Sequence, residues 1–97
     1  MVEVVWTKEA EDWLKDIHGY IAQDNPSAAL RTVLGSHERV GTLSQFPDIG
    51  HVYREEANGL VRVLNYGHYR IAYLRTSTLI YVLGVFHGAM EIERYFR

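Results

Sequence analysis

The chain has 97 residues, 47% of them hydrophobic and 23% charged, with a formal net charge of −2. This length favours one globular domain that spans residues 1–97. Cysteine is absent, which excludes disulfides and thiolate chemistry. The longest apolar run, Leu79–Phe86, is far shorter than the roughly 20 residues that cross a bilayer, and no leader pattern precedes Trp6. We therefore expect a cytoplasmic protein that binds no membrane.

The two halves of the chain differ in charge. Residues 1–58 hold five basic and ten acidic side chains, whereas residues 59–97 hold five arginines, two glutamates and no lysine. Guanidinium groups pair with carboxylates and phosphates through two parallel hydrogen bonds. The C-terminal half is therefore predicted to bind an anionic partner. The alternative is that each arginine is simply solvated on an exposed strand face.

A strand and a helix are predicted at the start of the chain. Residues 2–6 are rich in β-branched side chains, which favour a short strand. Thr7 then caps a helix that extends to about Gln23. The apolar residues of this helix recur at helical spacing and form one stripe, made of Ala10, Trp13, Leu14, Ile17 and Ile21.

A second helix begins at Asn25-Pro26, because asparagine caps the first amides and proline fits the first turn. The short connection makes the two helices an antiparallel hairpin. Gly35 and Gly41 each cost about 1 kcal/mol inside a helix, so we expect a close helix contact near one of them or a frayed helix end. The stripe expected to pack on the first helix contains Ala29, Leu30, Val33, Leu34, His37, Val40 and, at its end, Leu43.

The rest of the chain is predicted to be mostly strands. Residues 47–50 form a turn, and residues 51–58 form a loop or a short edge strand. Three β-type runs with tight turns between them then predict an antiparallel meander, over residues 60–65, 69–74 and 79–86. The predicted fold class is α+β: a short N-terminal strand and an antiparallel helical hairpin packed on a C-terminal antiparallel sheet of three to four strands.

One face of this sheet is the candidate binding surface. Alternate residues of a strand point to opposite faces, so Arg70 shares a face with Ala72 and Leu74, whereas Arg62 lies with Leu60 and Leu64. A helical hairpin covers only one face of such a sheet. The other face is expected to be solvated or to bind a partner.

No pattern in the sequence indicates a metal or a nucleotide cofactor. The five histidines form no HxxH or HxxxH pair, and glycine-rich phosphate loops and GxSxG are absent. We expect no metal and no cofactor. An enzyme of this sequence would work with acid–base groups alone.

Metal-free RNA cleavage is the enzymatic alternative. It needs a base, a cation for the phosphate and a proton donor. Arg70 and Arg62 are candidates for holding the phosphate, and His87 is the candidate proton donor. The candidate bases are three glutamates, Glu55, Glu56 and Glu91. The structural alternative is that His87 satisfies a backbone carbonyl and that the glutamates are surface charge.

Four segments occur in a distinctive order: YIAQDNPSAA, LSQFPDIG, GLVRVLNYGHYRIAYL and VLGVFHGA. This order resembles the RelE/ParE toxin superfamily of type II toxin–antitoxin modules, and more closely its ParE-like plasmid stabilisation branch. The resemblance covers nearly the whole chain. It implies a small toxin that a cognate antitoxin neutralises. ParE-like members characteristically poison DNA gyrase, whereas the ribonucleases of the superfamily cleave mRNA on the ribosome.

Antitoxin or target binding is assigned to arginines and exposed tyrosines of the C-terminal half. An acidic antitoxin segment would gain charge-assisted hydrogen bonds there. Tyr66 lies at a turn and Tyr95 near the end of the chain, where aromatic rings are most exposed. The full assignment is Arg62, Tyr66, Arg70, Arg75, Arg94 and Tyr95.

Three positions depart from the family pattern. Val61 and Val63 stand where ribonuclease members carry lysines, and Met90 stands where ParE-like sequences carry an arginine. We therefore predict a toxin that inhibits gyrase. The alternatives are a ribosome-dependent mRNA endoribonuclease that uses Arg70 and His87, or a degenerate, non-toxic module that only binds the antitoxin.

Overall fold

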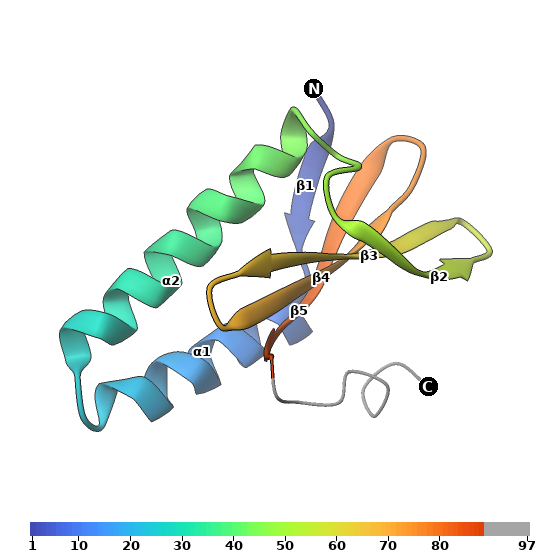
Figure 1. The fold of residues 1–97 in the computed structure, drawn as a ribbon. Coiled ribbons are helices and arrows are strands. Elements are labelled where there is room, and N and C mark those ends of the chain that lie inside the picture. Colours follow the sequence, from blue (N-terminus) through green and yellow to red (C-terminus); the bar gives the residue numbers. More distant parts are fainter. Residues whose placement is uncertain (89–97) are drawn as a thin grey trace.

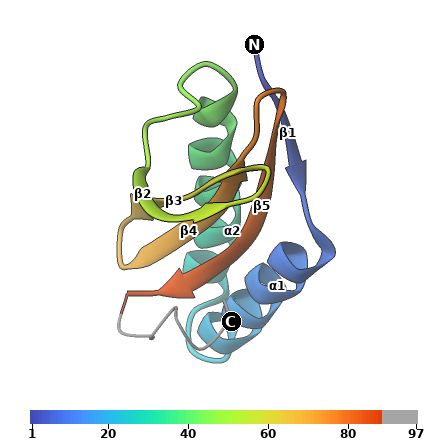
Figure 2. The ribbon, with the colours of Figure 1, turned by 90° about the vertical axis from the view of Figure 1, so that its right-hand side faces the viewer.

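The computed structural model describes residues 1–88. Two helices lie against one face of a five-stranded sheet (Figure 1), and the perpendicular view shows α2 behind the strands and α1 below them (Figure 2). The predicted α+β fold is confirmed. Neither helix within residues 1–88 has the length and apolarity of a membrane span. The elements are, in order, β1 (Glu3–Trp6), α1 (Lys8–Ala22), α2 (Pro26–Gly41), the 3-10 helix η1 (Thr42–Ser44), β2 (His51–Glu56), β3 (Gly59–Tyr66), β4 (Tyr69–Arg75) and β5 (Leu79–His87).

The sheet is wider than the three to four strands predicted. Its strand order is β1-β5-β4-β3-β2, in which β2 to β5 form an antiparallel meander. The N-terminal strand β1 pairs in parallel with β5, with Val4 opposite Ile80. Residues 51–58 were predicted to form a loop or a short edge strand, and the structure has the edge strand β2 there. β1 and β2 are the two edge strands of the sheet, and the predicted meander of β3, β4 and β5 lies between them.

Both predicted helix caps are present. The Thr7 hydroxyl oxygen accepts a hydrogen bond from the Ala10 amide at 3.1 Å and also donates one to the Val82 carbonyl at 2.7 Å. The Asn25 side-chain oxygen accepts a hydrogen bond from the Ala28 amide at 3.0 Å. Each cap satisfies an amide that a helix start otherwise leaves unpaired. The Thr7 bond to Val82 additionally fixes the start of α1 against β5.

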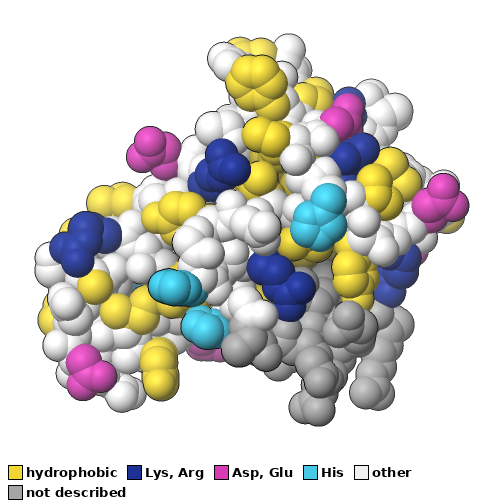
Figure 3. All heavy atoms as spheres, in the orientation of Figure 1, with side chains coloured by type: hydrophobic (Ala, Val, Ile, Leu, Met, Phe, Trp, Pro, Cys, Tyr) yellow, Lys and Arg dark blue, Asp and Glu magenta, His cyan; other side chains and the backbone are white. Residues whose placement is uncertain are grey.

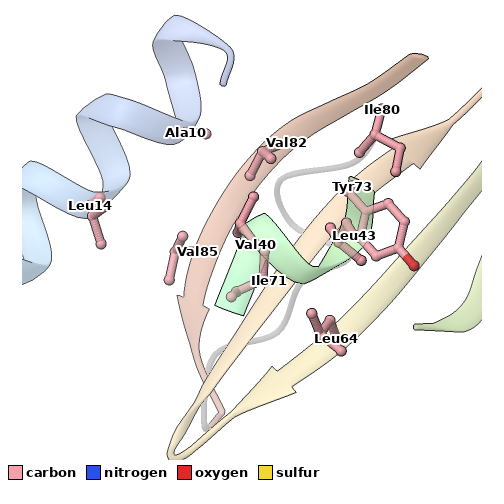
Figure 4. Packing of buried hydrophobic residues seen from close by; sticks show 10 residues of the cluster. All are labelled: Ala10, Leu14, Val40, Leu43, Leu64, Ile71, Tyr73, Ile80, Val82 and Val85. Atoms are coloured by element: carbon pink, nitrogen blue, oxygen red, sulfur yellow. The ribbon is translucent and has the colours of Figure 1, made fainter. Parts of the chain in front are cut away.

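The main core lies between the helical hairpin and the covered face of the sheet (Figure 4). Leu14 from α1, Val40 from α2 and Ile71 of the central strand β4 belong to this cluster, and all three are buried. Tyr73 is wholly buried in the same layer. The other buried members of this cluster are Ala10, Leu43, Leu64, Ile80, Val82 and Val85.

The buried stripe of α2 is rotated from the predicted one. Leu30 and Leu34 are 54% and 59% exposed, so placing these two in the packed stripe was wrong. His37 is exposed as well, but its ring lies 4.4 Å from that of Trp6. The helix instead buries Ala29, Ser36 and Val40. The rotation arises because α2 packs against the sheet as well as against α1. The Ser36 hydroxyl donates to the Thr32 carbonyl at 2.7 Å, which satisfies it inside the core.

Gly35 is the site of a close contact, and the partner is a strand residue. A Cβ atom at position 35 would overlap the hydroxyl of Tyr66 from β3. Tyr66 is half-buried against the hairpin, whereas the sequence had predicted an exposed ring. Gly35 lowers the helix propensity of α2, but its missing side chain leaves the space that the Tyr66 ring occupies.

Candidate functional site

Two of the predicted binding arginines lie on the helix-covered side of the sheet, next to Asp48. The Asp48 carboxylate oxygen is 3.5 Å from Nε of Arg62 and 3.2 Å from Nε of Arg75. Arg62 also donates to the Gly50 carbonyl at 2.6 Å. The Arg62 and Arg75 side chains are only 16% and 21% exposed. These arginines hold the turn after α2 against the sheet.

Tyr73 of β4 is hydrogen-bonded to the same turn. Its hydroxyl accepts a hydrogen bond from the Gly50 amide at 2.9 Å and donates one to the Pro47 carbonyl at 2.9 Å. Burial is the main cause that raises the pKa of Tyr73 above its ordinary value. The Pro47–Gly50 turn is therefore a structural junction between α2 and the sheet.

Arg70 lies on the opposite face of the sheet. In the strand register it stands across from Asn65 of β3 and Phe86 of β5. Phe86 is buried in a second apolar cluster, and the Trp13 ring of α1 meets it edge-on at 4.9 Å between centroids. The face that we expected to be solvated or to bind a partner is thus partly covered by Trp13. Arg70 lies near the end of this face, next to the β3–β4 turn.

A hollow of about 300 Å³ lies at that turn, and we call it the hairpin-end hollow. Arg70 and His87 are both among its lining residues, and so is His68, which sequence reasoning did not single out. In the face drawn in Figure 3, histidine side chains lie toward the middle, whereas Lys and Arg side chains are spread from one margin to the other and acidic ones lie mostly toward the margins. The lining residues are Asn65, Gly67, His68, Tyr69, Arg70, His87 and Gly88.

Backbone geometry brings the two histidines together. Gly67, with φ of 56°, opens the two-residue turn between β3 and β4, a conformation that glycine adopts readily. The Gly88 amide donates to the His68 carbonyl at 2.6 Å, which joins the end of β5 to this turn. The Tyr69 ring meets the His87 ring edge-on at 5.6 Å. Burial raises the pKa of Tyr69 above its ordinary value.

The candidate bases Glu55 and Glu56 do not reach this hollow. Glu56 stands opposite Gly59 and Arg70 opposite Asn65, so the two side chains are separated by most of β3, on the order of 20 Å. Glu56 is also paired with Arg54 at 2.7 Å. Assigning either glutamate as the base was therefore wrong. The third candidate base and three other predicted positions lie outside the described residues: Glu91, Met90, Arg94 and Tyr95.

Known proteins resemble this chain over most of its length. A family model described as "ParE toxin of type II toxin-antitoxin system, parDE" matches residues 4–92. Toxin RelE2 of Caulobacter vibrioides is 32% identical over 89 residues, which are 92% of this chain and 98% of the relative.

Two solved structures have the same fold. A chain from the chromosomal ParDE TA system of P. aeruginosa has a TM-score of 0.74 and 24% identity, and the match covers 90% of this chain and 96% of that one. A chain from the toxin–antitoxin complex RelBE2 of Mycobacterium tuberculosis has a TM-score of 0.54 and 25% identity, with 89% and 96% covered.

Proposed function

The chain belongs to the ParE toxin family of type II toxin–antitoxin systems, and we propose that it arrests growth by poisoning DNA gyrase until a cognate antitoxin neutralises it. The observation that carries the choice of gyrase is the composition of the hairpin-end hollow. Arg70 and His87 supply a cation and a proton donor, but no residue that lines the hollow among residues 1–88 is a carboxylate or a lysine. The glutamate base that metal-free cleavage of RNA was expected to use is therefore absent from the described lining.

The antitoxin is the proposed partner. The similar chain from Mycobacterium tuberculosis comes from a toxin–antitoxin complex, and an acidic antitoxin segment suits the arginine-rich half of this chain. Within the described residues we propose Arg70, on the face of the sheet opposite Arg62 and Arg75, and the half-buried Tyr66 as antitoxin contacts. Gyrase is a cytoplasmic enzyme, so we place the action of the toxin in the cytoplasm.

Induction of the chain in cells without the antitoxin tests this proposal. Gyrase poisoning predicts filamentous cells with DNA damage and continued translation, and co-expression of a cognate antitoxin should restore growth. Immediate arrest of translation with cleaved messages would contradict gyrase as the target. Normal growth, together with retained antitoxin binding, would identify a degenerate module.

A ribosome-dependent endoribonuclease is the second candidate function, because Arg70 and His87 both line the hairpin-end hollow. A His87→Gln variant separates it from the first. A nuclease that uses this histidine as its acid would lose most of its growth inhibition. A gyrase poison would keep arresting growth, and the His51→Gln variant serves as the matched control because His51 lies exposed at the start of β2.

A further inference from the structure

We propose that residues 89–97 pack over the middle of the sheet face opposite the two helices, which we call the outer face. The apolar sides of both helices pack on the other face of the sheet (Figure 1 and Figure 2). The centre of the outer face is nevertheless buried. The inference goes beyond the proposed function and does not depend on it, because it concerns the chain alone.

Three neighbouring strands contribute to the buried centre of the outer face. Val63 of β3, Ala72 of β4 and Phe86 of β5 form one cluster, and they are 1%, 0% and 1% exposed. The Phe86 ring lies over Gly84 of its own strand, where a Cβ atom would be 2.5 Å from the ring. The face of a sheet that no helix covers is ordinarily solvated. The burial of this one therefore needs a covering layer.

Residues 1–88 supply only part of that layer. The partly buried side chains that pack against the cluster are those of Trp13, Tyr53 and Leu83. Trp13 comes from α1 and meets the Phe86 ring edge-on at 4.9 Å between centroids, so it shields one side of that ring. Tyr53 and Leu83 belong to β2 and β5, which are strands of the same sheet. The nearly complete burial of Phe86 therefore indicates a further apolar segment above the strands.

The chain continues beyond Gly88 at the border of the outer face. Gly88 comes two residues after Phe86, and its amide donates to the His68 carbonyl at 2.6 Å, which holds the end of β5 beside the β3–β4 turn. The last residues, 89–97, span at most about 30 Å when extended. The path from β5 across β4 and β3 to β2 is about 14 Å at the usual strand spacing. The segment is therefore long enough to pass over all of these strands.

The sequence of the segment suits an apolar surface. Met90 and Ile92 alternate with Glu91 and Glu93, a pattern typical of a segment with one apolar side and one polar side. Two aromatic residues follow at positions 95 and 96. The apolar side matches the buried cluster of the outer face, and the polar side suits solvent.

The tether favours this segment over a separate partner as the occupant of the outer face. A segment joined to a surface by a short connection acts at an effective concentration in the millimolar range. It therefore occupies the surface ahead of a second copy of the chain or another free protein. A partner that approaches the middle of this face then meets the segment and not the strands.

A nitroxide spin label on the purified chain tests the inference by NMR, and the absence of cysteine allows a single label to be placed. A label at Glu93→Cys should remove most of the intensity of the Val63 and Ala72 methyl signals. It should spare the methyl signals of Leu34, which is exposed on α2. A label at Glu38→Cys, also exposed on α2, is the matched control and should give the reverse pattern.

A substitution within the segment gives a second readout. Ile92→Asp places a charge against the apolar outer face, so it should lower the urea midpoint of unfolding and weaken the effect of the label at position 93. Leu34→Asp introduces the same charge at an exposed leucine and should leave the midpoint nearly unchanged.

Other outcomes overturn the inference. Undiminished Val63 and Ala72 signals in the folded chain labelled at position 93 would exclude the segment from the outer face. Loss of these signals only when a spin-labelled chain is mixed with an isotope-labelled one would identify a second copy as the occupant. An Ile92→Asp variant with the wild-type midpoint and an undiminished label effect would show that the segment does not use its apolar side. These measurements need neither antitoxin nor gyrase, so their failure leaves the proposed function standing.

Discussion

The hydroxyl of Tyr73 donates a hydrogen bond to the carbonyl oxygen of Pro47, 2.9 Å away and 26 residues earlier in the chain. The same hydroxyl accepts the Gly50 amide, so the polar end of a wholly buried ring is satisfied on both sides. A buried polar group without partners would be costly. This arrangement connects the turn after α2 to the central strand β4.

Replacing Tyr73 with phenylalanine should lower the free energy of unfolding by about 1 to 3 kcal/mol, because the Gly50 amide and the Pro47 carbonyl both lose their partner. Urea denaturation followed by circular dichroism measures the change. Tyr20→Phe is the matched control, since the Tyr20 side chain is 77% exposed. Equal stability of the two variants would contradict a stabilising role of these bonds.

A methyl group at position 50 should also destabilise the fold. A Cβ atom there would lie 2.8 Å from the Tyr73 hydroxyl and 2.9 Å from the Val63 carbonyl oxygen. We expect Gly50→Ala to cost about 1 to 3 kcal/mol in the free energy of unfolding. Gly19→Ala, in the interior of α1 with nothing near its Cβ position, should instead gain about 0.5 to 1 kcal/mol.

Stability should fall in alkaline solution, in part through Tyr73. Burial raises the pKa of Tyr73 in the folded chain above the ordinary tyrosine value of about 10. The unfolded chain therefore loses this proton first, and the contribution is fully present below about pH 10 and lost as the pH rises further. Urea midpoints between pH 9 and pH 11 should fall less steeply for Tyr73→Phe than for the wild type. Parallel slopes would refute this contribution.

Two arginines from neighbouring strands should respond differently to the same substitution. Arg62→Gln removes the ion pair with Asp48 and the bond to the Gly50 carbonyl, so it should lower the thermal midpoint. Arg70→Gln should weaken antitoxin binding by about tenfold, as expected when a charged hydrogen-bond partner is lost, with a smaller change in melting. Calorimetric titration together with thermal melting separates the two. A reversed pattern would show that the binding face was misassigned.

Truncating a side chain should cost more stability on the buried side of α2 than on its exposed side. Val40 is buried, and Val40→Ala should cost about 1 to 3 kcal/mol of the free energy of unfolding. Leu34→Ala removes more atoms, yet it should change stability by no more than about 0.5 kcal/mol because Leu34 is 59% exposed. A large loss for Leu34→Ala would mean that this side of the helix is covered in the protein.

The parts of the fold that follow from local chemistry were predictable from the sequence. Thr7 and Asn25 cap the two helices because their side-chain oxygens are acceptors next to unpaired amides. Alternation placed Arg62 with Leu60 and Leu64, and Arg70 with Ala72 and Leu74, but it did not relate the faces of the two strands. The strand register puts Arg62 and Arg70 on opposite faces, so expecting both to hold one phosphate was wrong. The rotation of α2 was not predictable, since its apolar residues fill more than one side, and only the packing of both α1 and the sheet selects Ala29 and Val40 over Leu30.

The candidate site was predictable only in part, because it depends on contacts between distant positions. Asp48 is 14 and 27 residues away from the two arginines that it engages, and no spacing rule relates them. His68 stood out in no motif, since its place beside His87 arises from the hydrogen bond between the Gly88 amide and its own carbonyl. Gly67 in a two-residue turn predicts a hairpin, but it does not indicate which distant residues lie next to that turn.

The contact between Gly35 and Tyr66 has a consequence for how the sequences of related toxins vary. No side chain at position 35 is compatible with a tyrosine ring at position 66 in this arrangement. A relative that gains a side chain at the first position must shorten the second, or move the hairpin away from the helix. The residue types at these two positions, one in α2 and one in β3, should therefore covary across the family.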